Sequence, residues 1–234
     1  MAAVSALYGT AGQAGGSGFI SVMTFTSFPL DGIRPTAFAL NIVAAAYATW
    51  RMHRVDAIDW SLMRNLLATS VPASFLGGTV VLKGPVYAAL TGALLLVTAI
   101  LMVARVPREE RETLGRKGAL LAGALTGFAS GITGVGGGVF LSSILILFGQ
   151  VSPKKTAALS PPYIAVNSAA ALAGVLLAGQ RVPPSALPFA AAAILGSAIG
   201  TAIGRRWMSP FAIRSILALI LFVGAAQIFV RTFG

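Results

Sequence analysis

Two glycine-rich clusters are the parts of this sequence whose residue types and spacing could form a binding site. They span residues 12–18 (GQAGGSG) and residues 134–138 (GVGGG). Glycine is a poor helix former and permits positive φ, so each cluster is expected to break a helix. A helix that restarts after such a break presents N–H groups and a partial positive charge, which suits an anion. Each cluster therefore predicts a site built largely from backbone donors.

Polar side chains near the two clusters extend this candidate site, and Ser142, Ser143, Tyr163 and Ser168 supply further donors in the second half. The predicted substrate-binding residues are Gly12, Gln13, Gly15, Gly16, Asn41, Thr133, Gly134, Gly136, Gly137, Gly138, Ser160, Pro161 and Asn167.

Each of these features also has a purely structural interpretation. Glycines can simply allow helices to pack closely, and we expect this of two ladders with four-residue spacing. The tandem prolines Pro161-Pro162 should kink or unwind their helix, with or without a binding role for the neighbouring Ser160 and Asn167. The ladders are Gly123, Gly127 and Gly131, and Gly196, Gly200 and Gly204.

The composition is that of a polytopic membrane protein. Of 234 residues, 56% are hydrophobic and 10% are charged, against about 25% charged in soluble domains. Mean hydropathy is +0.86. The net charge is +11. We expect the basic residues behind it to face the cytoplasm and anionic lipid headgroups, and we expect no binding of nucleic acid. No basic residue precedes Arg34, so we expect no cleaved targeting peptide.

Charged residues divide the chain into eight apolar blocks. Six blocks have lengths that suit one membrane crossing each, for which about 20 residues are needed. The first and fifth blocks, of 30 and 36 residues, are too long for one straight crossing. Their midpoints fall inside the two glycine clusters. The blocks are residues 1–30, 35–50, 65–82, 84–104, 118–153, 156–180, 182–204 and 215–230.

The sequence lacks the residues for most enzymatic and metal chemistry. It has no cysteine and a single histidine, His53, which excludes thiolate nucleophiles and multi-histidine metal sites. All six acidic residues lie outside the apolar blocks, so the intramembrane carboxylate of many proton-coupled carriers is missing. We expect no enzyme activity, no metal and no cofactor.

The two halves of the chain resemble each other at an offset of 120–123 residues. We therefore expect a first repeat over residues 1–104, a basic cytoplasmic linker over 105–117 and a second repeat over 118–234. If each long block crosses the membrane once, ten of the 17 basic residues lie on one side and seven on the other. If each long block is a hairpin, the numbers become thirteen and four. The positive-inside rule favours hairpins. The expected fold is an all-α membrane protein of two inverted repeats, each a glycine-broken hairpin or helix followed by three transmembrane helices.

The second-half motif is similar to that of the TauE/SafE sulfite exporter family. The resemblance rests on residues 127–138 (GFASGITGVGGG), Gly149, residues 154–157 (KKTA) and Ser160. It implies export of sulfite or a sulfur-containing organic anion across the bacterial inner membrane.

The leading hypothesis is therefore a secondary transporter that exports a small anion. The missing carboxylates favour electrogenic export driven by the membrane potential alone. The alternative is a channel-like or regulatory membrane protein without alternating access. The sequence indicates no particular oligomeric state.

Overall fold

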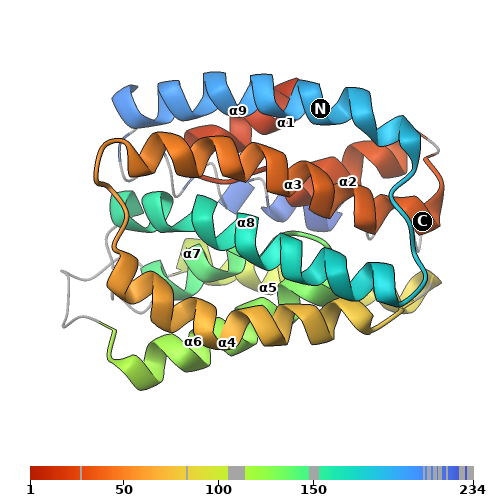
Figure 1. The fold of residues 1–234 in the computed structure, drawn as a ribbon, viewed down its shortest axis with the longest axis horizontal. Coiled ribbons are helices and arrows are strands. Elements are labelled where there is room, and N and C mark those ends of the chain that lie inside the picture. Colours follow the sequence, from red (N-terminus) through yellow and green to blue (C-terminus); the bar gives the residue numbers. More distant parts are fainter. Residues whose placement is uncertain are drawn as a thin grey trace.

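The computed structural model describes residues 1–26, 28–82, 84–104, 114–147, 153–207, 209, 212, 215, 218, 219, 221–226 and 230. Every regular element in these residues is helical, and the long helices run along one axis as a bundle (Figure 1). The elements are α1 (Ala2–Thr10), α2 (Gly16–Phe25), α3 (Leu30–His53), α4 (Trp60–Thr79), α5 (Gly84–Ala104), α6 (Arg116–Thr133), α7 (Gly138–Leu147), α8 (Pro153–Leu177), the 3-10 turn η1 (Pro184–Ala186) and α9 (Leu187–Trp207).

Both long apolar blocks break where the glycine clusters predict. Helix α1 ends before the first cluster and α2 begins within it, and the second cluster separates α6 from α7 in the same way. Five glycines in these breaks have positive φ, between 73° and 119°. A side chain is strained in that region, so the breaks depend on glycine. They are Gly12, Gly15, Gly134, Gly136 and Gly137.

Two glycine ladders join pairs of helices at the edges of the bundle, and both were predicted from their spacing. A Cβ on any ladder glycine would overlap a backbone carbonyl oxygen of the facing helix. Residue numbers rise together along each seam, so α9 runs parallel to α1 and α6 runs parallel to α4. Gly196, Gly200 and Gly204 of α9 face Ala2, Ala6 and Thr10, and Gly123, Gly127 and Gly131 of α6 face Leu66, Ser70 and Ser74.

Helix α8 runs parallel to α4 and antiparallel to α7. The Ser74 hydroxyl of α4 donates to the Asn167 carbonyl of α8 over 2.9 Å, and four residues further along Gly78 packs against the Ala171 carbonyl. Toward the other end of α8, the hydroxyls of Ser142 and Ser160 are 2.9 Å apart, while residue 136 lies beside residue 168. Since α6 and α4 are parallel, α6 and α7 run in opposite directions and form a hairpin.

The first glycine break also turns the chain back on itself. Gly16 lies beside Asn41, whereas Ile20 and Arg34 meet at Gly134, so α2 runs antiparallel to α3. Helices α3 and α8 lie side by side between the α1–α9 and α4–α6 edges (Figure 1).

Basic residues gather at one end of the bundle. The end of α3 and the starts of α4, α6 and α8 all lie at the left in Figure 1. Among the described residues, the opposite end carries Arg34 and Arg181. The basic end carries Arg51, Arg54, Arg64, Arg116, Lys117 and Lys155.

Polar side chains are buried among large apolar ones such as Phe19 and Phe38, while many other large apolar side chains point outward. Asn41, Ser130 and Ser160 are completely buried, whereas Leu121 of α6 and Leu187 of α9 are 63% and 79% exposed. Fully buried polar side chains together with exposed large apolar ones are typical of helices packed in lipid.

Two stretches among the described residues, Lys155–Leu177 and Pro184–Gly204, are long and apolar enough to cross a membrane. The expected number of crossings was larger. Part of the difference arises because the glycine breaks divide two blocks into helices of 9 to 18 residues. Helices α3 and α4 have 24 and 20 residues but are not apolar enough over that length. Most of the linker and six of the 16 residues of the last expected crossing lie outside the described residues. The repeats stay a prediction.

Candidate functional site

The two glycine breaks lie against each other in the middle of the bundle. Gly16, the first residue of α2, packs on the carbonyl oxygen of Val135 in the second break. The amide nitrogen of Asn41 lies 2.7 Å from where a Cβ would stand on Gly16, and at the same distance from a Cβ on Gly136. Residues predicted from opposite halves of the sequence therefore meet at one place, which we call the junction: Gln13, Gly16, Asn41, Gly136, Gly138, Ser142, Ser160 and Ser168.

Asn41 connects α3 to the second break. It is completely buried, and its Nδ2 donates to the Gly134 carbonyl over 3.4 Å. With Nδ2 as the donor of this long bond, Oδ1 is the atom without a hydrogen-bond partner among the described residues. An unpaired buried acceptor costs about 1–3 kcal/mol unless a ligand or water pairs with it.

A chain of hydrogen bonds links the first break to the second hairpin and α8. Gln13 Nε2 donates to the Ser142 hydroxyl over 2.9 Å, and Ser142 is hydrogen-bonded to Ser160 over 2.9 Å. Ser160 in turn donates to the Thr156 carbonyl over 2.8 Å. The Gln13 Oε1 atom has no partner among the described residues. The predicted Gln13 and Ser160 therefore share one polar network through Ser142.

Glycine is required where α7 begins. A Cβ on Gly136 would lie 2.7–3.1 Å from Asn41, Ile164 and Ser168, and one on Gly138 would lie 2.6 Å from Gln13 Oε1. The Ser168 hydroxyl, like the two amide oxygens, is buried without a partner in the described part of the chain. The first N–H groups of α2 and α7 start at this junction, where the helix dipoles favour negative charge.

Pro161 acts on the junction through the backbone. Proline has no N–H, so the Ala157 carbonyl one turn earlier loses its helical partner. Gly12 packs against this carbonyl. Helix α8 nevertheless continues through both prolines, so the unwinding that the sequence allowed does not occur.

Several predicted residues lie beside the junction rather than in it. The Thr133 hydroxyl donates to the Ala129 carbonyl of its own helix over 2.7 Å. Asn167 donates to the Tyr163 carbonyl over 2.9 Å. Gly15 packs on the Phe19 ring, and Gly137 packs on Ser130 and Tyr163. Their side chains or backbones support the helices that form the junction.

Arg34 is a buried residue that the sequence analysis treated as a block boundary. Helix α3 begins at Leu30, so Arg34 lies inside the helix and is only 5% exposed. Its guanidinium donates to the carbonyls of Gly77 and Val80, each over 2.7 Å, and of Gly78 over 3.1 Å. It also donates to the Gly131 carbonyl of α6. Pro29, which precedes the helix as its N-cap, was the signal that the helix starts a turn before Arg34.

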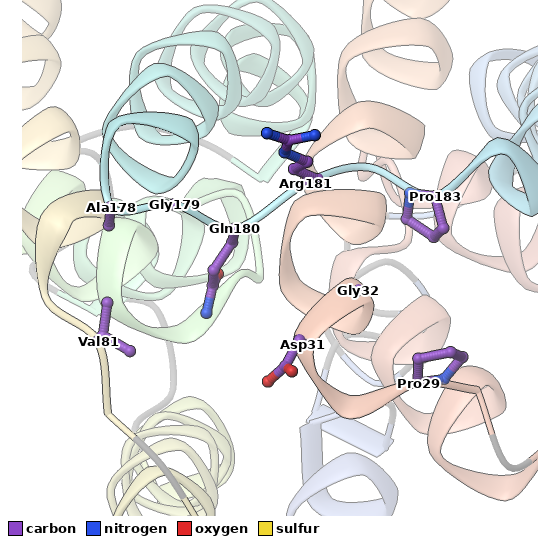
Figure 2. Close-up of a pocket in the computed structure, with 9 residues that line it drawn as sticks. All are labelled: Pro29, Asp31, Gly32, Val81, Ala178, Gly179, Gln180, Arg181 and Pro183. Atoms are coloured by element: carbon purple, nitrogen blue, oxygen red, sulfur yellow. The ribbon is translucent and has the colours of Figure 1, made fainter.

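An open cavity of about 460 Å³ lies at the Arg34 end of the bundle. It is lined by Asp31 of α3, by Val81 after α4, and by the segment that follows α8 (Figure 2). Figure 2 shows Asp31 and Gln180 extending toward a common space, with Arg181 on the other side of its segment.

Comparisons with known proteins identify what the chain is similar to. Residues 1–228 match the family model described as Sulfite exporter TauE/SafE. The chain is 35% identical over 232 residues to "Probable membrane transporter protein y4hK" of Sinorhizobium fredii, covering 96% of this chain and 94% of that protein. No solved structure matches the chain. The resemblance seen in the glycine motif is therefore confirmed.

Proposed function

Because the chain belongs to the TauE/SafE sulfite exporter family and is a membrane transporter, we propose that it exports sulfite or an organosulfonate. The proposed location is the inner membrane of a bacterium, with the chain crossing it several times. The proposed partners are this small anion and the anionic headgroups of the surrounding lipid.

The junction of the two glycine breaks supports an anion as substrate. Two helix N-termini, those of α2 and α7, start beside Asn41 and Gln13. Such N-termini supply N–H donors and partial positive charge, and the neighbouring hydroxyls can rotate to donate as well. The observation that carries the proposal is the contact of Gly16 with Val135, which brings both breaks to one buried place.

The directions of the helices support an inverted repeat. Helices α1, α3 and α9 run one way, while α4, α6 and α8 run the other way. If residues 1–104 and 118–234 are the two repeats, equivalent helices α1 and α6, or α3 and α8, have opposite directions. Transporters built in this way bind substrate at the interface of the repeats and expose it to each side by rocking one against the other.

We place the basic end of the bundle in the cytoplasm, as the positive-inside rule requires. The cavity beside Arg34 then opens to the outside. Export of an anion from a cell with a negative interior is favoured by about 2.3 kcal/mol per charge per 100 mV. No coupling ion is needed for that direction of transport.

Flux through the purified protein in proteoliposomes tests this function. A transporter with alternating access shows saturable sulfite efflux and counterflow, in which unlabelled substrate on one side drives uptake of labelled substrate from the other. The channel-like alternative predicts flux without counterflow. A regulatory protein predicts no flux above that of empty vesicles.

A further inference from the structure

Arg34 is a buried charge whose hydrogen-bond partners, within the described part of the chain, are all neutral. These partners are the backbone carbonyls of Gly77, Gly78 and Val80 at the end of α4 and of Gly131 near the end of α6. Carbonyl dipoles compensate the desolvation of a guanidinium but leave its net charge in place, whereas a carboxylate would cancel it. The region around Arg34 therefore keeps a positive charge that an anion can use.

The position of Arg34 links the second glycine break to the cavity at the same end of the bundle. Its Cγ lies 3.3 Å from where a Cβ would stand on Gly134. One turn earlier in α3, Asp31 and Gly32 line the cavity, and Val81 lines it next to Val80, which accepts a hydrogen bond from the guanidinium. Arg34 therefore lies between the second glycine break and residues that line the cavity.

One donor of Arg34 is unused. Nε is buried and has no hydrogen-bond partner among the described residues. The residue as a whole is only 5% exposed, so water cannot easily supply that partner. A guanidinium offers five N–H donors in a planar fork that matches the oxygen atoms of an oxyanion. Hydrogen bonds to a charged acceptor are also about twice as strong as those to a neutral carbonyl.

We propose that Arg34 binds the transported anion on its way to the outer cavity and makes the path selective for anions over neutral solutes of the same shape. The inference rests on the proposed function, since it assigns a residue to the same transport path. In the conformation described here the carbonyls of α4 and α6 hold the guanidinium. The oxyanion replaces some of these carbonyls when it arrives.

A different role would leave a different signature. If Arg34 only caps the ends of α4 and α6, its removal lowers the stability of the ligand-free protein and leaves anion binding unchanged. Anion binding must therefore be measured as the shift that a ligand causes within each variant, rather than from the stability of the variants themselves.

The test uses the full-length protein in lipid nanodiscs. The melting temperature is measured against increasing sulfite, methanesulfonate and the neutral dimethyl sulfone, and the ligand-induced shift gives an apparent Kd. The variants are Arg34→Gln, which keeps donors without charge, and Arg34→Lys, which keeps the charge without the fork. Arg64→Gln is the matched control, because it removes one exposed charge at the opposite end of the bundle, away from the junction and the cavity.

We expect the wild type and Arg64→Gln to bind both anions with the same Kd within about twofold and to show no shift with the sulfone. Arg34→Gln should weaken anion binding by about tenfold or more, the loss expected for one charge-assisted hydrogen bond. The Kd of Arg34→Lys for the anions should lie between those of the wild type and Arg34→Gln.

Wild-type anion affinity in Arg34→Gln would overturn the assignment. If Arg34→Gln does not fold, Arg34→Lys decides the matter, because unchanged affinity in that variant also contradicts it. Failure of the proposed function looks different: the wild type then responds to neither anion, and both proposals fall together.

Discussion

The side chain of Asn41 donates from Nδ2 to the carbonyl oxygen of Gly134 over 3.4 Å and ties α3 to the break in the second hairpin. The two residues are 93 positions apart in the sequence. The bond is long, and the other amide atom, Oδ1, has no partner in the described part of the chain. Asn41 is thus placed to bind something other than the protein.

Replacing Asn41 by Ala should reduce transport much more than stability. The long hydrogen bond contributes little to stability, and removal of an unpaired buried acceptor offsets part of the lost packing. We therefore expect the free energy of unfolding to change by about 1 kcal/mol or less. Transport should fall by about tenfold or more if Asn41 contacts the substrate. Counterflow in proteoliposomes and detergent-induced unfolding measure the two effects.

Ser197→Ala is the control for this variant. The Ser197 hydroxyl is buried and donates to the Ala44 carbonyl over 2.8 Å, away from the junction. Its loss should cost about 1 kcal/mol and leave transport intact. Wild-type counterflow in Asn41→Ala would remove this residue from the site.

Gly136→Ala should abolish transport in a protein that still folds and inserts. The new methyl group would lie 2.7 Å from the Asn41 amide nitrogen and displace it from the junction. The positive φ of 89° adds strain. Gly179→Ala separates the two effects, because Gly179 has a φ of 86° but open space around its Cβ position. If both variants lose the same amount of transport, strain rather than the junction explains the result.

Gly200→Ala should lower stability instead. Its methyl group would overlap the Ala6 carbonyl and force α9 away from α1, a kind of overpacking that costs about 1–3 kcal/mol. The fraction that remains folded should transport normally. Gly115→Ala, at a glycine with nothing within 4 Å of its Cβ position, should leave unfolding unchanged within about 0.5 kcal/mol. Equal unfolding curves for the two variants would show that the α1–α9 seam tolerates a side chain.

The breaks and the ladders could be predicted from the sequence because both are local. A block too long for the membrane has to break at its weakest helix formers, and small residues four apart lie on one helix face. The pairing of α9 with α1 could not be predicted, since no local pattern says which helix the ladder faces. The same holds for the hydrogen bond of Gln13 to Ser142, which joins residues 129 positions apart.

Arg34 was missed for a physical reason. A charged residue marks the boundary of an apolar block only where water solvates its charge. Helix α3 starts a turn earlier, and the exposed carbonyls at the ends of α4 and α6 solvate the guanidinium in place of water. The side chains of Thr133 and Asn167, which the sequence also places in the site, donate to carbonyls of their own helices. Asn167 Oδ1 has no partner among the described residues, and the role of both residues stays a prediction.

The orientation in the membrane can be tested by labelling cysteines. The chain contains no native cysteine, so single replacements of Arg54, Lys117 and Arg181 give clean probes. We expect an impermeant maleimide added to intact cells to label position 181 and to label positions 54 and 117 only after the membrane is opened. Labelling of positions 54 and 181 from the same side would contradict both the hairpins and the basic cytoplasmic end.

Transport should be electrogenic and should need no ion gradient. Among the described residues no carboxylate lies at the junction, where Asn41, Gln13 and the serines supply neutral groups. A carrier that moves protons with its substrate usually needs such a carboxylate. At 100 mV the potential alone could expel a monoanion against a gradient of nearly fiftyfold, which corresponds to about 2.3 kcal/mol.

Proteoliposomes loaded with sulfite and clamped with potassium and valinomycin measure this dependence of efflux on the membrane potential. Efflux should rise as the interior becomes negative and persist when the pH gradient is collapsed. Efflux that follows the pH gradient and ignores the potential would instead indicate proton coupling, with Asp31 at the outer cavity as the nearest acid to test.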